Sequence, residues 1–259
     1  MLPMKIIQRL TDLVITLLLW SYFLFGSVAF FFLFYIPAYL FSKDHVTAFQ
    51  NLNSLHMKIF FALVRLLVPR AKFVIREEVR AIRSSVIVCN HISYLDPILL
   101  ISLLPSLCTI VKSTFFTVPF FGWLLRNSGY IPSTPSEMTG PAMIKNLENI
   151  KKHLASGGNL FVFPEGTRSR NGKLTEFNKG VFSIARYCAA PLQLVLLRGT
   201  NDLFRPGSFL FGTRNFSRIE VKLIRCLKPD YASENFSAAV LADQSRAFFE
   251  DAVSRDADR

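Results

Sequence analysis

From residue 71 onward the chain alternates short apolar runs with longer segments in which apolar residues have helical spacing. The short runs, rich in β-branched and aromatic residues, are predicted as strands: Lys72–Ile75, Val86–Cys89, Leu107–Val111, Asn159–Phe163, Leu192–Leu197 and Arg218–Leu227. The longer segments are predicted as helices: Pro97–Leu104, Phe116–Asn127, Pro141–Ala155, Lys179–Ala189 and Ser237–Val253. This alternation predicts an α/β domain with a mixed, largely parallel sheet flanked by helices.

The N-terminal part has a different pattern. An uncharged stretch, Leu13–Ser42, consists mainly of Leu, Phe, Val, Ile and Tyr. It exceeds the roughly 20 residues that a straight helix needs to cross a hydrocarbon core. We expect either one tilted span or a segment that bends near Gly26 and returns as a re-entrant hairpin. We therefore divide the chain into membrane-anchoring helices, residues 1–70, and an α/β domain, residues 71–259.

The segment Leu52–Val68 is predicted as an amphipathic helix. Its apolar residues at helical spacing are Leu55, Ile59, Ala62, Leu63 and Leu66. Such a helix can lie on a bilayer or pack against the following domain, and the sequence leaves both alternatives open. Basic residues then follow closely: Arg65, Arg70, Lys72, Arg76, Arg80 and Arg83. By the positive-inside tendency, the following domain is expected on the cytoplasmic side.

The composition of the chain indicates which class of partner the protein binds. The chain is 51% hydrophobic, has 26 Phe residues and carries a formal net charge of +12. A basic, apolar chain favours an anionic membrane surface, and with no nucleic-acid-binding motif or Lys/Arg-rich run we expect no nucleic-acid partner. The few Cys and His residues are scattered without the spacing of a zinc or redox site, so we expect no bound metal.

The best candidate for chemistry is the stretch Val86–Pro97, in which a strand runs into Asn-His and Asp-Pro follows. Asp96 is predicted as the N-cap of the next helix, with Pro97 at its first position. A turn between strand and helix would let the Asp96 carboxylate face His91. It would then fix the imidazole tautomer and leave the other nitrogen free to take a proton from a hydroxyl. Because Asp-Pro opens many helices and Asn-His can merely satisfy a turn, a purely structural interpretation also stays open.

A second polar cluster, Pro164–Gly172, follows the predicted strand Asn159–Phe163. Gly allows a ligand to approach the backbone, hydroxyl groups and amides donate hydrogen bonds, and Arg can bind a phosphate with two bonds. A loop of this composition alone is usually a solvated turn. Together with His91 and Asp96 it predicts a site with a base on one side and an anion cradle on the other.

The two motifs together resemble those of the 1-acylglycerol-3-phosphate acyltransferases of the glycerolipid acyltransferase superfamily. The first is Asn-His, four residues and Asp, present as Asn90–Asp96; the second is Phe-Pro-Glu-Gly-Thr-Arg-Ser, present as Phe163–Ser169. The resemblance extends from about Val86 to Thr200 and includes Lys112, Val118–Trp123, Lys179-Gly180 and the strand at Pro191.

This resemblance implies a membrane-bound enzyme that transfers a fatty acyl group from acyl-CoA or acyl carrier protein to a lysolipid hydroxyl, foremost that of 1-acylglycerol-3-phosphate. His91 would be the general base and Asp96 its orienting partner. The implied substrate-binding residues are Asn90, Lys112, Glu165, Gly166, Thr167, Arg168 and Ser169, with Arg168 as the phosphate contact. The resemblance implies no metal or redox cofactor. The partners would be membrane lipids, the lysolipid and the thioester donor, with the catalytic domain on the cytoplasmic face of the membrane.

The sequence departs from the family pattern in two places. The second motif usually leads to an Arg that holds the acceptor phosphate, and the matching stretch Gly129–Pro135 lacks it, although Arg126 or Lys145 could substitute. The strand after Pro191 lacks a usual second Pro. The alternatives are therefore transfer to a different lipid acceptor, such as another lysophospholipid or a lyso-aminolipid, and an inactive lipid-binding homologue. The latter is disfavoured by the intact His91 and Asp96.

Overall fold

The computed structural model describes residues 2–133, 140–169, 174–213 and 217–257. Within these residues one sheet of seven strands has the order β1-β7-β6-β2-β5-β3-β4. The strands are β1 Ala71–Ile75, β2 Val86–Cys89, β3 Leu107–Val111, β4 Ile131–Pro132, β5 Asn159–Val162, β6 Leu192–Arg198 and β7 Ser217–Leu227. All neighbouring pairs are parallel except β6 and β7. The predicted mixed, largely parallel sheet is confirmed.

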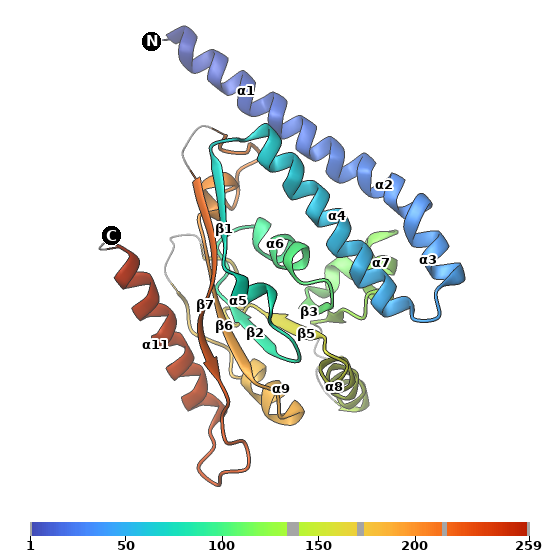
Figure 1. Cartoon of the computed structure of the whole chain (residues 1–259), viewed down its shortest axis with the longest axis vertical. Helices are drawn as coiled ribbons and strands as arrows, with labels where there is room; N and C mark the ends of the chain where they lie inside the picture. The colour runs from blue at the N-terminus through green and yellow to red at the C-terminus, as the bar shows by residue number, and fades with distance from the viewer. Residues whose placement is uncertain (1, 134–139, 170–173, 214–216, 258–259) are drawn as a thin grey trace.

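The helices lie on both faces of this sheet (Figure 1). The α-helices are α1 Leu2–Ser21, α2 Ser27–Phe30, α3 Ile36–Phe41, α4 His45–Leu67, α5 Glu77–Arg80, α6 Leu95–Leu103, α7 Phe121–Asn127, α8 Gly140–Ala155, α9 Gly180–Cys188, α10 Thr200–Leu203 and α11 Ala238–Ala257. Two π-helical turns, η1 Tyr22–Gly26 and η2 Phe31–Tyr35, join α1 to α3, and a 3₁₀-helix, η3 Ser113–Thr117, precedes α7. The predicted helix Phe116–Asn127 is thus two helices, because Phe120 has a positive φ of 60° between them.

The core consists of two apolar clusters, one on each face of the sheet. Along the buried strand β2, Ile87 and Cys89 join the cluster that includes α4, α5 and α6. Val86 and Val88 point the other way, into the cluster that includes α8, α9 and α11. Because successive side chains of a strand alternate between faces, a short strand that is apolar at every position can be covered on both sides. This fixes β2 firmly, and its carboxyl end carries the predicted catalytic pair.

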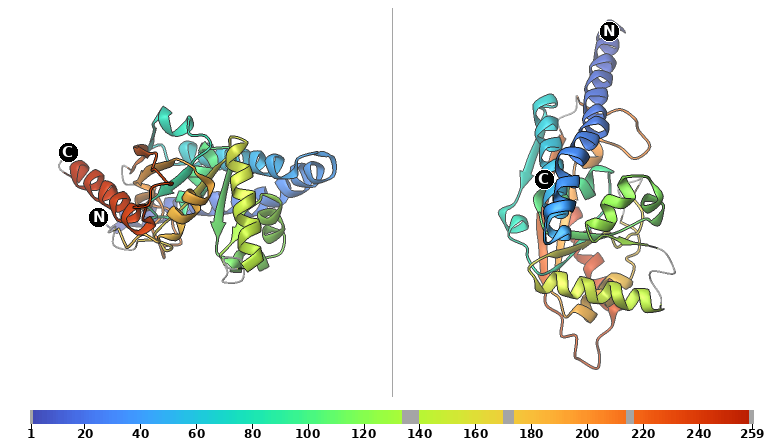
Figure 2. Two further views of the ribbon diagram at one scale, coloured as in Figure 1. Left: turned by 90° about the horizontal axis from the view of Figure 1, so that it is seen from below. Right: turned by 90° about the vertical axis from the view of Figure 1, so that its right-hand side faces the viewer.

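The N-terminal helices form a long hairpin. The helix passes through Gly26 with right-handed dihedral angles (φ −62°, ψ −40°), so the alternative of a re-entrant bend near Gly26 is wrong. The chain reverses instead at residues 42–44, where the Asp44 carboxylate accepts a hydrogen bond from the Thr47 amide (3.0 Å) and begins α4. By length and composition, the region Ile7–Phe41 could cross a membrane. Only 11% of its most apolar part is buried inside the protein. Its N-terminal end projects beyond the sheet (Figure 2).

Helix α4 packs on the domain with one apolar face and leaves another exposed. Phe60, Phe61 and Val64 are buried against the sheet-side core. Leu55 and Leu66, which belong to the predicted apolar face, are 44% and 74% exposed. The alternative in which this helix packs against the domain is therefore confirmed, but it does so with the face opposite to the predicted one. The exposed face leaves room for a lipid contact as well.

Candidate active site

The predicted catalytic pair lies in the turn between β2 and α6. Helix α6 begins at Leu95, with Tyr94 as an N-cap that makes no side-chain bond, so the prediction of Asp96 as N-cap is wrong by two residues. The Asp96 carboxylate nevertheless folds back over the turn. Its Oδ2 accepts hydrogen bonds from the amides of Ile92 (2.7 Å) and Ser93 (2.7 Å). Both amides precede the helix, so these bonds do not cap it but fix the carboxylate to the turn that follows β2.

Asp96 and His91 face each other as predicted. His91 Nδ1 lies 2.9 Å from Asp96 Oδ2, with the carboxylate fully buried and the imidazole 15% exposed. Because a carboxylate accepts and does not donate, Nδ1 carries the proton and Nε2 is left as the basic nitrogen. The imidazole also stacks on the Phe163 ring, with centroids 4.0 Å apart and planes inclined by 14°. The ring is thus held both at its edge and on its face.

Thr200 completes the environment of the buried carboxylate. Its Oγ1 donates to Asp96 Oδ1 at 2.5 Å, and Thr200 itself is 1% exposed. A buried charge is tolerated only when its polar atoms are satisfied, and here both carboxylate oxygens accept from the protein. Thr200 is not among the site residues that the sequence predicts. The available signal was its position directly after β6, which is the parallel neighbour of β2 and ends at the same edge of the sheet.

The second motif clamps the backbone of His91. The amide of His91 donates to Glu165 Oε1 (2.9 Å), and its carbonyl accepts from the amide of Ser169 (2.8 Å). The other Glu165 oxygen accepts from the Thr175 amide (3.3 Å). Burial raises the pKa of the Glu165 carboxyl above its usual value, although these hydrogen bonds oppose the shift. Glu165 thus holds the two loops together, and its predicted contact with the acceptor stays a prediction.

The rest of the second motif lies closer to solvent. Gly166 and Thr167 are exposed, and Gly166 has a positive φ of 67°, which favours glycine. Arg168 places its guanidinium carbon 3.3 Å from the centre of the Tyr94 ring. Its Nη1 is buried and has no hydrogen-bond partner among the described residues. Ser169 is buried, and the cluster's last positions, Arg170 to Gly172, lie outside the described residues.

The remaining predicted residues are placed less directly. The Asn90 side chain is buried and exchanges two hydrogen bonds with the Leu197 backbone (2.9 and 2.8 Å), which ties the end of β2 to β6. Its predicted contact with substrate stays a prediction. Lys112 is exposed directly after β3, at the sheet edge where β2 and β5 also end.

The two suggested replacements for the second-motif Arg differ in their surroundings. Arg126 donates to the Phe116 carbonyl (2.9 Å) and lies over the Phe116 ring. Lys145 is exposed on α8. The stretch Gly129–Pro135 ends in Thr134 and Pro135, which lie outside the described residues. Of Arg126, Lys145 and Arg168, Arg168 is the residue for which a contact with the catalytic turn is observed, at Tyr94.

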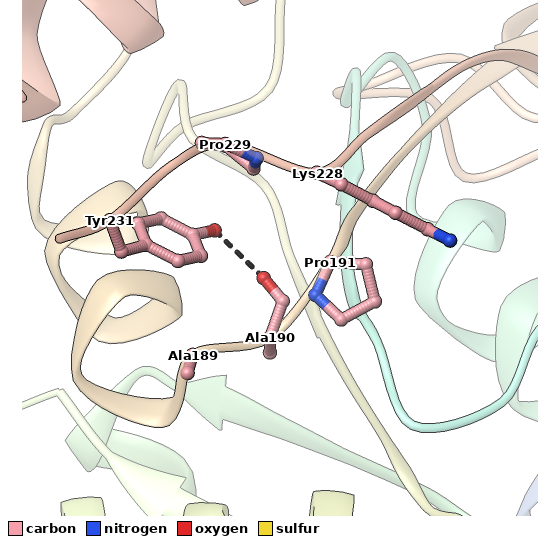
Figure 3. A pocket seen from close by; sticks show the side chains of 6 residues that line it. All are labelled: Ala189, Ala190, Pro191, Lys228, Pro229 and Tyr231. Atoms are coloured by element: carbon pink, nitrogen blue, oxygen red, sulfur yellow. Dashed lines mark hydrogen bonds between the residues drawn. The ribbon is translucent and has the colours of Figure 1, made fainter. Parts of the chain in front are cut away.

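A cavity of about 200 Å³ lies elsewhere. Figure 3 shows it between the ends of β6 and β7, where the Tyr231 hydroxyl donates to the Ala190 carbonyl (2.7 Å). This is the amino-terminal end of β6, opposite to the end that carries Thr200, so the cavity is not part of the site. Among the described residues no group of three His, Cys, Asp or Glu side chains could hold a metal ion.

Comparison with known proteins settles the family. Residues 70–219 match the acyltransferase family. The chain belongs to this family. A 1-acyl-sn-glycerol-3-phosphate acyltransferase of Brassica napus chloroplasts is 34% identical over 161 residues, 62% of this chain and 44% of the relative. The corresponding protein of Saccharomyces cerevisiae is 31% identical over 185 residues, 70% of this chain and 58% of that protein. The resemblance inferred from the two motifs is confirmed, although the chain spans only about half the length of these relatives.

The fold has a solved counterpart. The crystal structure of a 1-acyl-sn-glycerophosphate acyltransferase from Thermotoga maritima superposes with a TM-score of 0.65. The match covers 97% of this chain and 96% of the Thermotoga chain, at 22% sequence identity. At this identity the likeness establishes the fold, including the N-terminal helices, and leaves activity to be argued from the site.

Proposed function

We propose that this acyltransferase moves a fatty acyl group from acyl-CoA or acyl carrier protein to the hydroxyl of 1-acylglycerol-3-phosphate, which gives phosphatidate. The observation that carries the proposal is the bond between His91 Nδ1 and the fully buried Asp96 carboxylate, 2.9 Å long, beside the Arg168 loop. The bond leaves a basic nitrogen on the catalytic turn, and the Arg168 guanidinium lies on Tyr94 of the same turn. A base for the hydroxyl and a cation for the phosphate are the two groups that acylation of a phosphorylated alcohol requires. The names of the relatives support the same reaction.

In the proposed reaction His91 Nε2 takes the proton of the acceptor hydroxyl. The oxygen attacks the thioester carbonyl carbon, and the tetrahedral intermediate collapses as the carbon–sulfur bond breaks. The departing thiolate then takes the proton from the His91 imidazolium, so the base is regenerated and no acyl-enzyme forms. No metal or redox cofactor has a part in this proposal.

Asp96 has two tasks in this scheme. Its bond to Nδ1 keeps the neutral imidazole in the tautomer with a basic Nε2, and its charge stabilises the imidazolium that forms during attack. The amides of Ile92 and Ser93 and the Thr200 hydroxyl hold the carboxylate in place. A carboxylate that is prepositioned in this way need not reorganise when the charge develops.

Arg168 is proposed to bind the acceptor phosphate. It is tethered to the catalytic turn through Tyr94, and its Nη1 is a buried donor without a partner among the described residues. Guanidinium groups bind phosphate through two parallel hydrogen bonds, which fix orientation as well as position. Binding of the phosphate there would bring the neighbouring glycerol hydroxyl towards His91.

The N-terminal hairpin is proposed to attach the enzyme to a membrane, with the catalytic domain on its cytoplasmic side. The helices from α1 to α3 expose many large apolar side chains, among them Phe25 (68%), Leu33 (65%) and Phe41 (83%). The basic residues that follow α4 fit an anionic cytoplasmic surface. This location supplies an amphipathic acceptor to the site, while the thioester arrives from the aqueous phase.

The direct test is acyl transfer by the detergent-purified protein. Labelled acyl-CoA and acyl carrier protein would be offered with a panel of acceptors: lysophosphatidate, lysophospholipids with other head groups, a lyso-aminolipid and monoacylglycerol. We expect transfer to lysophosphatidate at the highest kcat/KM, with His91→Ala as the inactive control. If the protein acylated other acceptors of the panel but not lysophosphatidate, the proposed acceptor would be wrong and the acyl-transfer reaction would stand. Transfer to no member would overturn it.

A further inference from the structure

The contact between Arg168 and Tyr94 is unusually close. Carbon atoms in contact lie about 3.5 Å apart, so a distance of 3.3 Å from the Arg168 Cζ to the ring centre requires the guanidinium to lie flat on the ring. Other arginines of the described chain lie farther from their aromatic partners, for example Arg65 at 4.5 Å from Phe73 and Arg126 at 5.7 Å from Phe116. The contact therefore fixes the plane of one particular guanidinium.

The guanidinium is held by its face rather than by its donors. Within the described residues Arg168 forms no salt bridge, and its buried Nη1 has no hydrogen-bond partner. This differs from Arg126, whose Nη2 donates to the Phe116 carbonyl while the side chain lies over the Phe116 ring. Buried donors in proteins are nearly always bonded, so an unbonded one requires an explanation. Stacking uses the face of the guanidinium and leaves its N–H groups, which all lie at the edge, free of a bond to the ring.

We propose that Tyr94 is a positioning residue whose ring holds the Arg168 guanidinium flat and directs its N–H edge to the anionic head group of the acceptor. The proposal rests on the proposed function and adds to it a residue that acts through Arg168. A free arginine side chain loses about 2 kcal/mol of rotamer entropy when it is fixed. A stacked one has lost part of that freedom before the ligand arrives, and so binds the anion more tightly.

Tyr94 is itself held by the catalytic turn. The Ser93 hydroxyl accepts from the Leu95 amide (3.2 Å) and donates to the Phe204 carbonyl (2.7 Å). The Phe204 ring is 5% exposed and lies beside Tyr94, with centroids 5.8 Å apart. The turn that fixes Asp96 thus also fixes the ring under Arg168. One short segment, from His91 to Asp96, would set the distance between the base and the phosphate contact.

The test compares Tyr94→Leu with Tyr94→Phe. Leucine keeps bulk but removes the π face, whereas phenylalanine keeps the face and removes only the hydroxyl. Tyr187→Leu is the matched control: Tyr187 is 43% exposed against 46% for Tyr94, and its ring faces a cation, Lys151, at 5.7 Å. Each purified full-length variant would be assayed with acyl-CoA and either lysophosphatidate or monoacylglycerol, and thermal melting would confirm its fold.

We expect Tyr94→Leu to raise KM for lysophosphatidate about fivefold to tenfold with kcat little changed, the fold-change that loss of one cation–π contact predicts. KM for monoacylglycerol should stay the same, and Tyr94→Phe and Tyr187→Leu should keep the wild-type KM for both acceptors. In an Arg168→Ala background Tyr94→Leu should cause no further loss, because the two residues act through one contact.

Several outcomes would overturn the assignment. An unchanged KM for lysophosphatidate in Tyr94→Leu, an equal rise for monoacylglycerol, or a full effect in the Arg168→Ala background would each contradict it while leaving the acyltransferase function intact. If the wild type acylates no lysolipid, the proposed function fails. Calorimetric binding of lysophosphatidate to the same variants would then decide the role of Tyr94, since weaker binding to Tyr94→Leu alone would support it and equal or absent binding would refute it.

Discussion

Two loops leave the same edge of the sheet, and they differ in how completely their polar groups are used. In the turn after β2, both Asp96 oxygens and His91 Nδ1 are bonded within the protein. In the loop after β5, Gly166 and Thr167 are exposed, and Arg168 Nη1 has no hydrogen-bond partner among the described residues. The first loop is built to keep one geometry, and the second retains donors for a ligand. We infer that the first sets the rate of acyl transfer and the second sets the choice of acceptor.

The largest effect is expected at Asp96. In Asp96→Asn the amide can donate to His91 Nδ1 and so favours the wrong tautomer, which should lower kcat by about a thousandfold or more. KM for the acceptor should change little, because the second loop is intact. Steady-state kinetics with both substrates would measure this. Asp202→Asn, at an exposed position of α10, is the matched control and should behave as the wild type.

The converse effect is expected at Arg168. Arg168→Ala should raise KM for lysophosphatidate by about tenfold to a hundredfold, which corresponds to the loss of one or two charge-assisted hydrogen bonds. KM for monoacylglycerol, which has no phosphate, should change far less. Arg126→Ala, which removes a guanidinium already bonded to Phe116, serves as the comparison. Equal losses for the phosphorylated and neutral acceptors would show that Arg168 acts on structure rather than on phosphate.

A smaller effect is expected at Thr200. Thr200→Val keeps the shape of the side chain but removes the donor to Asp96 Oδ1, which should lower kcat about tenfold through a less well fixed carboxylate. Thr200→Ser should restore most of the loss, which a purely steric role would not predict. The kcat of both variants, measured at saturating acceptor, distinguishes these explanations.

The smallest effect concerns Glu165, which joins the two loops. Burial raises its pKa, so the folded state binds a proton more strongly than the unfolded state does. Stability should therefore decrease as pH rises from near 4.5, the ordinary pKa, through the raised value in the folded protein. Urea denaturation across this range should show a decrease in the free energy of unfolding that is absent in Glu165→Gln. An identical pH dependence in both proteins would show that Glu165 is not the group responsible.

The strands of the sheet were predicted well because the spacing and length of the apolar runs are enough to distinguish a buried strand from a helix. Val86–Cys89 and Leu107–Val111 are strands at the predicted bounds, since each is a short apolar run with no competing helical pattern. β4 was missed because it has two residues, one of them Pro132. The exposed face of α4 was mistaken for its packing face because both faces are apolar, and only the tertiary structure chooses between them.

The candidate site was predicted in part for a similar reason. His91 and Asp96 are close in sequence and joined by a turn, so their contact follows from local geometry. Thr200 is more than a hundred residues from Asp96, and its contact depends on β6 lying beside β2. The stacking of Arg168 on Tyr94 and of His91 on Phe163 likewise depends on the loop after β5 crossing the turn after β2. No sequence pattern predicts that these two loops cross.

The most direct test of the central claim is a single-turnover measurement of acyl transfer from labelled acyl-CoA to lysophosphatidate by wild type and His91→Ala, with both substrates bound at saturation. If His91 is the general base oriented by Asp96, the variant should bind both substrates with nearly wild-type affinity and transfer the acyl group at a rate lower by about two to four orders of magnitude. A His91→Ala protein that transfers the acyl group at the wild-type rate would contradict the account.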